Sequence, residues 1–364
     1  MAIREEALLL VDIDRSRMRW CAALRQSGQL TLMDVRSVAL PSDDAARAEA
    51  VRKTLREGLL ATGAEHPTVL TALPKHLVFL RVFDAPAVSR RDLEKILSLR
   101  VAQEVPNYSA DLVRWGYEVL EHPTGKRSIA LSAVRREALE TFLLDFRAAG
   151  IEPDVVDVEP LALACWFVAQ VGADQESLSL VDIGDQNTSL TMIQNGCIHS
   201  FSQLPVSHRD IMEAGATRFM LEVQSALQST GEANPAAAIV LCGESRATRG
   251  LVESASRDQR IDSIENTVQR AHCKVLIPSA RLDGNAHILE SLVWRANRKS
   301  EAMTNLVAQK QWSASPGMQA ITRRALSIPT LAIVTVALLA IFYFATNWMR
   351  EQRTVAIEES LAAI

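Results

Sequence analysis

The sequence predicts an α/β protein with a duplicated domain, followed by one membrane-spanning helix. The tetrapeptide Leu-Val-Asp-Ile occurs twice, at residues 10–13 and 180–183, each time at the end of an apolar run and before a polar turn. Strand patterns and helix patterns alternate along both halves of the chain, as they do in α/β folds. The third observation is residues 325–348, a stretch that contains no charged side chain.

The predicted strands form two groups, one in each half of the chain. In the first half they cover residues 7–13, 18–24, 30–39, 69–72, 77–83, 113–120, 128–134 and 155–158. In the second half they cover residues 178–183, 189–193, 198–201 and 238–241. In both halves a strand, a polar turn and another strand follow one another at the repeated tetrapeptide, which favours duplication over chance.

Helical patterns separate these strands. The first helix is expected from Ser42, a good N-cap residue, to near Gly63. The second begins at Ser89 and ends before Pro106, because proline lacks the amide hydrogen that a helix interior needs. A third ends at Gly150, where glycine commonly closes a helix. Further helices are expected at residues 207–229, after the turn 242–244, and at about 285–296.

Residues 325–348 are predicted to cross a membrane. A helix of this length rises about 1.5 Å per residue and exceeds the ~30 Å thickness of a bilayer core. The stretch is apolar all round, so a buried core helix is a poor explanation. Basic residues are denser before it than after it, which by the positive-inside rule places the large N-terminal body in the cytoplasm.

Composition points away from several other classes of protein. With 48% hydrophobic residues, 23% charged residues and a net charge of −4, the chain lacks the basic excess typical of nucleic-acid-binding proteins. Its histidines and cysteines are dispersed and show no zinc-binding spacing. No Gly-x-Ser-x-Gly nucleophile elbow is present, so a hydrolase triad is not supported.

Residues 103–163 carry a family resemblance. The segments Gln-Glu-Val-Pro-Asn-Tyr (103–108), Trp-Gly-Tyr-Glu-Val-Leu (115–120) and Ala-Ala-Gly-Ile-Glu-Pro-Asp-Val-Val-Asp-Val-Glu-Pro-Leu-Ala-Leu (148–163) follow in the order and spacing seen in PilM-type proteins. These are the actin-like cytoplasmic components of type IV pilus assembly, and GspL-type proteins of type II secretion are their relatives. The chain resembles this group over about residues 1–300.

This resemblance implies an actin-like fold of two ribonuclease-H-like halves with an inserted subdomain. The expected organisation is a first half at 1–175 with the insertion at about 75–150, a second half at 176–297, a polar linker at 298–324, the transmembrane helix at 325–348 and a short non-cytoplasmic tail at 349–364. The implied location is the bacterial inner membrane, crossed once.

The resemblance also implies a nucleotide site, whose first loop looks degraded. In this family the first acidic residue, matched by Asp12, is followed by a glycine and small hydroxylated residues that cradle phosphates. Asp14 stands where the glycine is expected, and Ser16 is flanked by Arg15 and Arg17. A carboxylate at this place would repel phosphate oxygens, so ATP hydrolysis is not expected and the chain is predicted not to be an enzyme.

The second loop keeps more of the family pattern. Gly184 allows a tight turn beside Asn187, Thr188 can donate its hydroxyl, and Asp182 together with Asp12 is the candidate Mg²⁺ ligand pair. Gly243 aligns with one of two glycines that contact adenosine in the family. The candidate cofactor is therefore ATP with Mg²⁺. The alternative is that these aspartates lie in solvated turns and bind nothing.

A short segment near the C-terminus suggests a partner-binding site. Asn305, Leu306 and Val307, followed by basic residues and the predicted span, are similar to the start of PilN-type membrane proteins. In those proteins a short Asn-Leu-Leu motif docks into a groove on PilM. The chain thus resembles a fusion of the two, whose segment docks in cis or onto a neighbouring copy. A plain linker is the alternative.

These observations favour a non-enzymatic inner-membrane scaffold of a type IV pilus or type II secretion machine. Its expected partners are other platform proteins and an assembly ATPase, and a homodimer is compatible with docking onto a neighbour. One alternative is a nucleotide-binding ATPase of the actin, sugar-kinase and Hsp70 class. Another is an FtsA-like cytoskeletal protein, although such proteins attach by an amphipathic helix, unlike residues 325–348.

Overall fold

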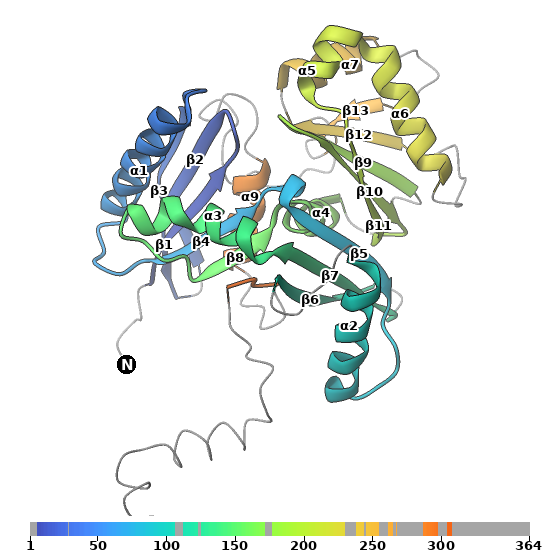
Figure 1. Cartoon of the computed structure of the whole chain (residues 1–364), viewed down its shortest axis with the longest axis horizontal. Coiled ribbons are helices and arrows are strands. Elements are labelled where there is room, and N and C mark those ends of the chain that lie inside the picture. Colours follow the sequence, from blue (N-terminus) through green and yellow to red (C-terminus); the bar gives the residue numbers. More distant parts are fainter. Residues whose placement is uncertain are drawn as a thin grey trace, which may run out of the picture. The chain divides into compact units, whose positions relative to one another are not determined.

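The computed structural model of the chain contains three β-sheets and the helices that cover them (Figure 1). It describes residues 6–27, 29–105, 112–122, 125–171, 177–229, 238–243, 245–254, 261–264, 267, 287–297 and 304–307. All of these residues belong to one compact unit, Met1–Ala308.

The first sheet has the strand order β3-β2-β1-β4-β8. Its strands are β1 (Glu6–Ile13), β2 (Arg17–Gln26), β3 (Gln29–Ala39), β4 (Thr68–Leu73) and β8 (Val155–Val158). The first three form an antiparallel meander, β4 runs parallel to β1, and β8 runs parallel to β4. The central strand β1 carries the first copy of Leu-Val-Asp-Ile.

The second sheet repeats this arrangement with the order β11-β10-β9-β12-β13. Its strands are β9 (Ser177–Ile183), β10 (Thr188–Gln194), β11 (Cys197–Leu204), β12 (Ala238–Gly243) and β13 (Ile261–Ser263). Again three strands form an antiparallel meander and two follow in parallel. The second Leu-Val-Asp-Ile ends β9, so both copies occupy the same place in equivalent sheets.

A three-stranded sheet is inserted between β4 and β8. It contains β5 (Val78–Asp84), β6 (Val113–Glu121) and β7 (Arg127–Arg135), in the order β5-β7-β6. The helix α2 (Arg90–Glu104) packs on it through Val101, and its N-cap is the predicted Ser89, which accepts a hydrogen bond from the Asp92 amide. A short 3₁₀ helix, η1 (Lys75–Leu77), joins β4 to β5.

Helices cover both faces of the first sheet. Leu9 and Val11 of β1 pack with α1 (Asp44–Ala61) and α3 (Arg136–Ala148), which lie on one face (Figure 1). Leu8 and Leu10 point the other way, toward α4 (Glu159–Val171) and α9 (His287–Asn297). This alternation follows from the two-residue period of a strand that is buried on both faces.

The second sheet is also covered on both faces. On one face lie α5 (His208–Ala214), α6 (Ala216–Ser229) and α7 (Ser245–Ser254). Val181 and Ile183 of β9 pack with Phe219 and Val223 of α6. Leu178 and Leu180, on the opposite face of β9, share a core with α4 and α9. A single apolar cluster therefore joins residues of both sheets through these two helices.

A buried arginine ties α9 to the inserted sheet and to the first sheet. Arg295, 4% exposed, donates two hydrogen bonds from Nη1 to the Glu118 carboxylate, at 2.7 and 2.9 Å. Its Nε lies 2.8 Å from Asp157 Oδ2. Burial, opposed by Arg295, raises the pKa of Asp157 to about 6. The three side chains link β6, β8 and α9.

Some details differ from the sequence predictions. The first helix is capped by Asp43, which accepts a hydrogen bond from the Ala46 amide, and not by Ser42. The predicted helix 207–229 is two helices, because Gly215 adopts φ +86° between them. The helix α4 was not predicted, since its run of apolar residues shows no clear period.

The predicted transmembrane helix at 325–348 lies outside the described residues, as do most of the predicted linker and the tail. Within the described part of the chain, no helix is long and apolar enough to cross a membrane. The domain boundaries given above stay predictions.

Candidate functional site

The two repeated aspartates lie at the ends of the equivalent strands β1 and β9. Asp12 is 6% exposed and Asp182 is 4% exposed. Neither aspartate therefore lies in a solvated turn. Carboxylates buried this deeply need positive partners or hydrogen bonds, and each finds a cationic side chain of the same chain.

Asp12 is paired with an arginine of the neighbouring strand. Arg19, on β2, stands opposite Asp12 in the antiparallel register and donates from Nη1 to Asp12 Oδ2 at 2.9 Å. Both side chains are buried. Burial raises the pKa of Asp12, and Arg19 opposes this effect. Arg19 was not recognised as a site residue from the sequence. Antiparallel pairing of the two predicted strands would have placed it opposite Asp12.

Asp182 is paired with Lys75, which lies directly after β4 and Pro74. The Lys75 Nζ donates a short hydrogen bond to Asp182 Oδ2 and another, 3.0 Å long, to Glu159 Oε1. The backbone amide of Lys75 also donates to Glu159 Oε2, at 2.9 Å. Lys75 is 5% exposed. Burial by itself would lower its pKa, but Asp182 and Glu159 outweigh burial and raise it, so the side chain carries a charge.

Glu159, the first residue of α4, is the second carboxylate on this lysine. Burial and the nearby Asp182 raise the pKa of Glu159, while Lys75 lowers it. Asp182 and Glu159 share one ammonium group, so the three side chains together would carry a surplus negative charge, and this favours protonation of Glu159. Lys75 and Glu159 were missed from the sequence, since nothing near either residue indicates a partner so far along the chain.

The lysine side chain fills the space beside Gly184. A Cβ atom added at Gly184 would lie 2.6 Å from Lys75 Cε and 2.9 Å from the carbonyl oxygen of Asn187. The Gly184 amide donates to that same carbonyl, at 3.1 Å. The backbone turn at the Asn187 carbonyl therefore requires the glycine, and the lysine stem lies against the same position.

The first loop meets the second loop through a carboxylate. The backbone amide of Ser16 donates to Asp185 Oδ2 at 3.1 Å, and His208 Nδ1 lies 3.1 Å from Asp185 Oδ1. Asp14 is also near Asp185: burial, and next the Asp185 charge, raise the pKa of Asp14 to about 6. Asp185 was not singled out from the sequence.

The other predicted cofactor residues are also engaged within the chain. The Thr188 hydroxyl donates to the carbonyl of Val206 at 2.6 Å. The Asn187 side-chain amide donates to Gln203 at 3.3 Å. Gly243, with φ +104°, stands opposite Ile183, and an added Cβ would lie 2.0 Å from the Ile183 carbonyl oxygen. The close approach of β12 and β9 is enough to require this glycine.

These residues do not fit ATP with Mg²⁺. A Mg²⁺ ion at Asp182 would compete with the Lys75 ammonium group for the carboxylate, and one at Asp12 would compete with the Arg19 guanidinium group. The Ser16 amide, a natural phosphate donor, already has a carboxylate acceptor. Across the described residues, no three or more histidine, cysteine or acidic side chains are arranged to hold a metal ion.

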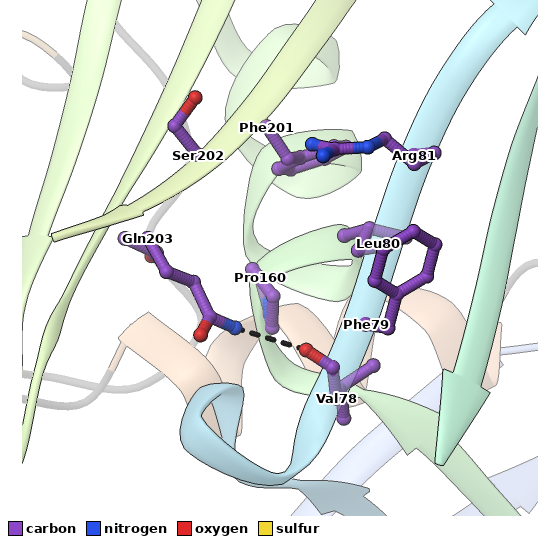
Figure 2. Close-up of a pocket in the computed structure, with 9 residues that line it drawn as sticks. Val78, Phe79, Leu80, Arg81, Pro160, Phe201, Ser202 and Gln203 are labelled. Carbon is purple, nitrogen blue, oxygen red and sulfur yellow. Dashed lines mark hydrogen bonds between the residues drawn. The ribbon is translucent and has the colours of Figure 1, made fainter. Parts of the chain in front are cut away.

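A cavity of about 200 Å³ lies beside this cluster, between β5 and β11 (Figure 2). Gln203 of β11 reaches across and donates from Nε2 to the carbonyls of Val78, at 2.9 Å, and Lys75. None of the predicted cofactor residues lines this cavity. Gln203 therefore links the second sheet to the backbone on both sides of η1.

Residues 304–307, here called the strap, lie along β8 of the same chain. The Leu306 amide donates to the Val156 carbonyl at 3.0 Å. The Asn305 side chain accepts from the Val156 amide at 3.1 Å and donates to the Asp154 carbonyl at 2.8 Å, so it pairs with β8 as a strand would. Leu306 is 5% exposed in an apolar cluster with Val156 and Val158, and Thr304 is buried.

Two mixed sheets of equivalent topology, facing acidic strand ends and an inserted subdomain define an α/β protein of the actin-like class. The family described as type IV pilus assembly protein PilM matches residues 11–204, more than half of the chain. The chain belongs to this family.

One solved structure supports the fold, and two others are similar to the chain at lower TM-scores. A PilM–PilN type IV pilus biogenesis complex contains a chain 19% identical in sequence with a TM-score of 0.61, and the match covers 80% of this chain and 98% of that one. The cytoplasmic domain of EpsL, an inner membrane component of the type II secretion system of Vibrio cholerae, is 15% identical with a TM-score of 0.42, covering 74% and 94%. A Bacteroides thetaiotaomicron protein with an actin-like ATPase fold is 6% identical with a TM-score of 0.47, covering 74% and 96%.

Asp14→Asn is expected to stabilise the protein at pH 8 and to have little effect near pH 4. The folded pKa of about 6 lies above the ordinary value of 3.8, so the folded state binds the proton more tightly. Stability contributed by this group therefore falls as pH rises from about 4 to about 6. Because Asp14 is partly exposed, the gain at pH 8 is about 1 kcal/mol. Chemical denaturation at both pH values measures it.

Asp92→Asn is the matched control. Ser89 donates to Asp92 in the exposed first turn of α2 and lowers the pKa of Asp92, so this change should not stabilise the protein at either pH. Equal effects of Asp14→Asn at pH 4 and pH 8 would contradict the assigned charge environment of the first loop.

Proposed function

We propose that this chain is a membrane-tethered, non-enzymatic assembly component of a type IV pilus or type II secretion machine. Its actin-like body acts in the cytoplasm and its C-terminal helix at 325–348 anchors it in the inner membrane. Membership of the PilM family supports the pilus or secretion setting. The uncharged stretch with basic residues before it supports the anchor and its orientation.

The observation that carries the proposal is the strap. Asn305 and Leu306, which lie within the predicted linker at 298–324, fix the chain on β8 before the predicted span. A pull on the linker is therefore resisted first by a buried leucine and a set of hydrogen bonds on the first sheet. A loose tether would need no such attachment, so the strap favours a segment that is fixed to the body before the chain continues toward the predicted span.

A non-enzymatic role is supported by the pairing of the loop residues. Asp12 and Asp182 each carry a cationic partner of the chain, and the Ser16 amide is bound to Asp185. Catalysis of phosphoryl transfer depends on metal ions and donors aimed at the phosphates. Here those groups are committed to one another.

Partners are proposed from the setting of the similar structure. That structure is a complex of PilM with PilN, and we extend to this chain binding to inner-membrane platform proteins of that kind and to an assembly ATPase. The strap supplies in cis a segment that resembles the start of PilN. Binding of the strap to a second copy would instead give a homodimer.

Deletion of residues 325–348 is expected to move the chain from the membrane to the soluble fraction and to abolish pilus assembly or secretion in cells that rely on it. Replacement by an unrelated apolar helix of equal length should restore both, because the span acts as an anchor. Cell fractionation and surface pilus or secretion assays measure the outcome. Intact function after deletion would refute the tether.

Changing both Asn305 and Leu306 to Asp is expected to lower the thermal unfolding midpoint of the full chain by several degrees. Truncation of a buried leucine alone typically costs about 2–5 kcal/mol, and the buried charge adds to this. Leu60→Asp, at a position 80% exposed, is the control and should leave the midpoint unchanged. If the double variant unfolds like the control and self-associates as the parent does, the segment is only a linker.

The alternative is a nucleotide-binding protein, favoured by the actin-like fold itself. Calorimetry of the full chain with ATP and Mg²⁺ separates the two. We expect no heat of binding from the parent. Micromolar binding that is lost in Asp182→Ala, with the variant shown to be folded by circular dichroism, would make this a nucleotide-responsive assembly protein.

A further inference from the structure

We propose that the chain closes its two actin-like halves with its own charges, Lys75 standing in for a bound cation and Asp185 for a bound anion. The inference extends the proposed non-enzymatic role. It concerns the contact between the halves and does not depend on the membrane anchor.

The cationic side of this clamp is Lys75. The residue follows β4 of the first half, and its Nζ binds Asp182 at the end of β9 in the second half. Glu159, at the start of α4, holds the lysine from the first half through both its ammonium group and its backbone amide. A compact positive charge between carboxylates of two elements is the role that a divalent ion has in many sites.

The fit of this lysine argues that its position is built into the fold. Its stem packs against Gly184, where an added Cβ would lie 2.6 Å from Lys75 Cε and would force the lysine to shift. Gln203, from the second sheet, donates to the Val78 carbonyl (Figure 2) and also to the Lys75 carbonyl, and so holds the turn around η1. The Lys75 ammonium group is therefore positioned by contacts to the side-chain methylenes, to the backbone and to Nζ of this residue.

The anionic side is Asp185. Its carboxylate accepts the backbone amide of Ser16, 169 residues away on the first loop. His208 Nδ1, at the start of α5, lies 3.1 Å from the other oxygen. Backbone amides at such loops are natural donors to anions, and here the anion is a side chain of the other half.

Both contacts join one half to the other, and the two halves contribute side chains of opposite charge. Lys75 brings a positive group from the first half to the second, and Asp185 brings a negative group from the second half to the first. Asp14 is close enough to Asp185 to oppose the closure by repulsion. The halves are thus expected to be closed in the absence of any nucleotide or metal ion.

Hydrogen–deuterium exchange on the full chain in detergent tests this. Peptides covering residues 12–18 and 182–188 should be protected without ligand. Addition of 5 mM ATP with Mg²⁺ should change their exchange rates less than twofold. This concentration is roughly a thousand times a micromolar Kd, so it would saturate such a site. Lys75→Met, which keeps the stem and removes the charge, should speed exchange in both peptides at least tenfold. Arg147→Met, which breaks the exposed pair with Glu140, should leave both unchanged.

Asp185→Asn keeps the proposal testable if Lys75→Met does not fold. It removes only the negative charge at the loop contact and should speed exchange of the 12–18 peptide alone. Loops that exchange freely in the parent and become protected only with ATP and Mg²⁺ would overturn the inference, as would unchanged exchange in both variants. Calorimetric ATP binding together with protected loops in the ligand-free parent would contradict the expectation that the chain binds no nucleotide, while leaving the clamp intact.

Discussion

The ion pair between Lys75 and the buried Asp182 and Glu159 is the interaction on which the rest of the site depends. The fold brings strand ends from both halves together and buries their carboxylates, which is unfavourable unless a cation accompanies them. Lys75 provides it, and the neighbouring features follow. The lysine stem packs against Gly184, and Gln203 fixes the turn that carries the lysine.

The same device occurs a second time in the described part of the chain. Arg295 joins Glu118 of the inserted sheet to Asp157 of the first sheet, again fully buried. The strap lies against the same strand, where Leu306 pairs with Val156, next to Asp157. A buried cation therefore ties the inserted sheet and the first sheet together near the point where the body connects to its C-terminal segment. Such pairs are specific in geometry because removal of either partner leaves an unpaired buried charge.

Local patterns were sufficient to predict most strands, because strand periodicity and turn residues are local. The repeated Leu-Val-Asp-Ile led to the two equivalent sheets, and Asp14 beside Arg15 indicated that the first loop had changed. Lys75 could not be found in this way, since its two carboxylates lie 84 and 107 residues further along the chain. Gly243 shows the opposite error. It resembled a ligand contact, although a close approach to the Ile183 carbonyl explains it.

An actin-like body that supplies its own counter-charges differs physically from one that closes around a ligand. In the latter, closure depends on ligand concentration, because only binding energy brings the halves together. In a body that supplies its own counter-charges, closure depends on the folded chain alone. The strength of that closure is set by the Lys75 and Asp185 contacts, which favour it, and by the repulsion between Asp14 and Asp185, which opposes it. On the proposal above, a body of this kind keeps a constant shape for its membrane-bound partners. Any change of state must then come from those partners, through the surfaces that they bind or through the strap that leads to the membrane.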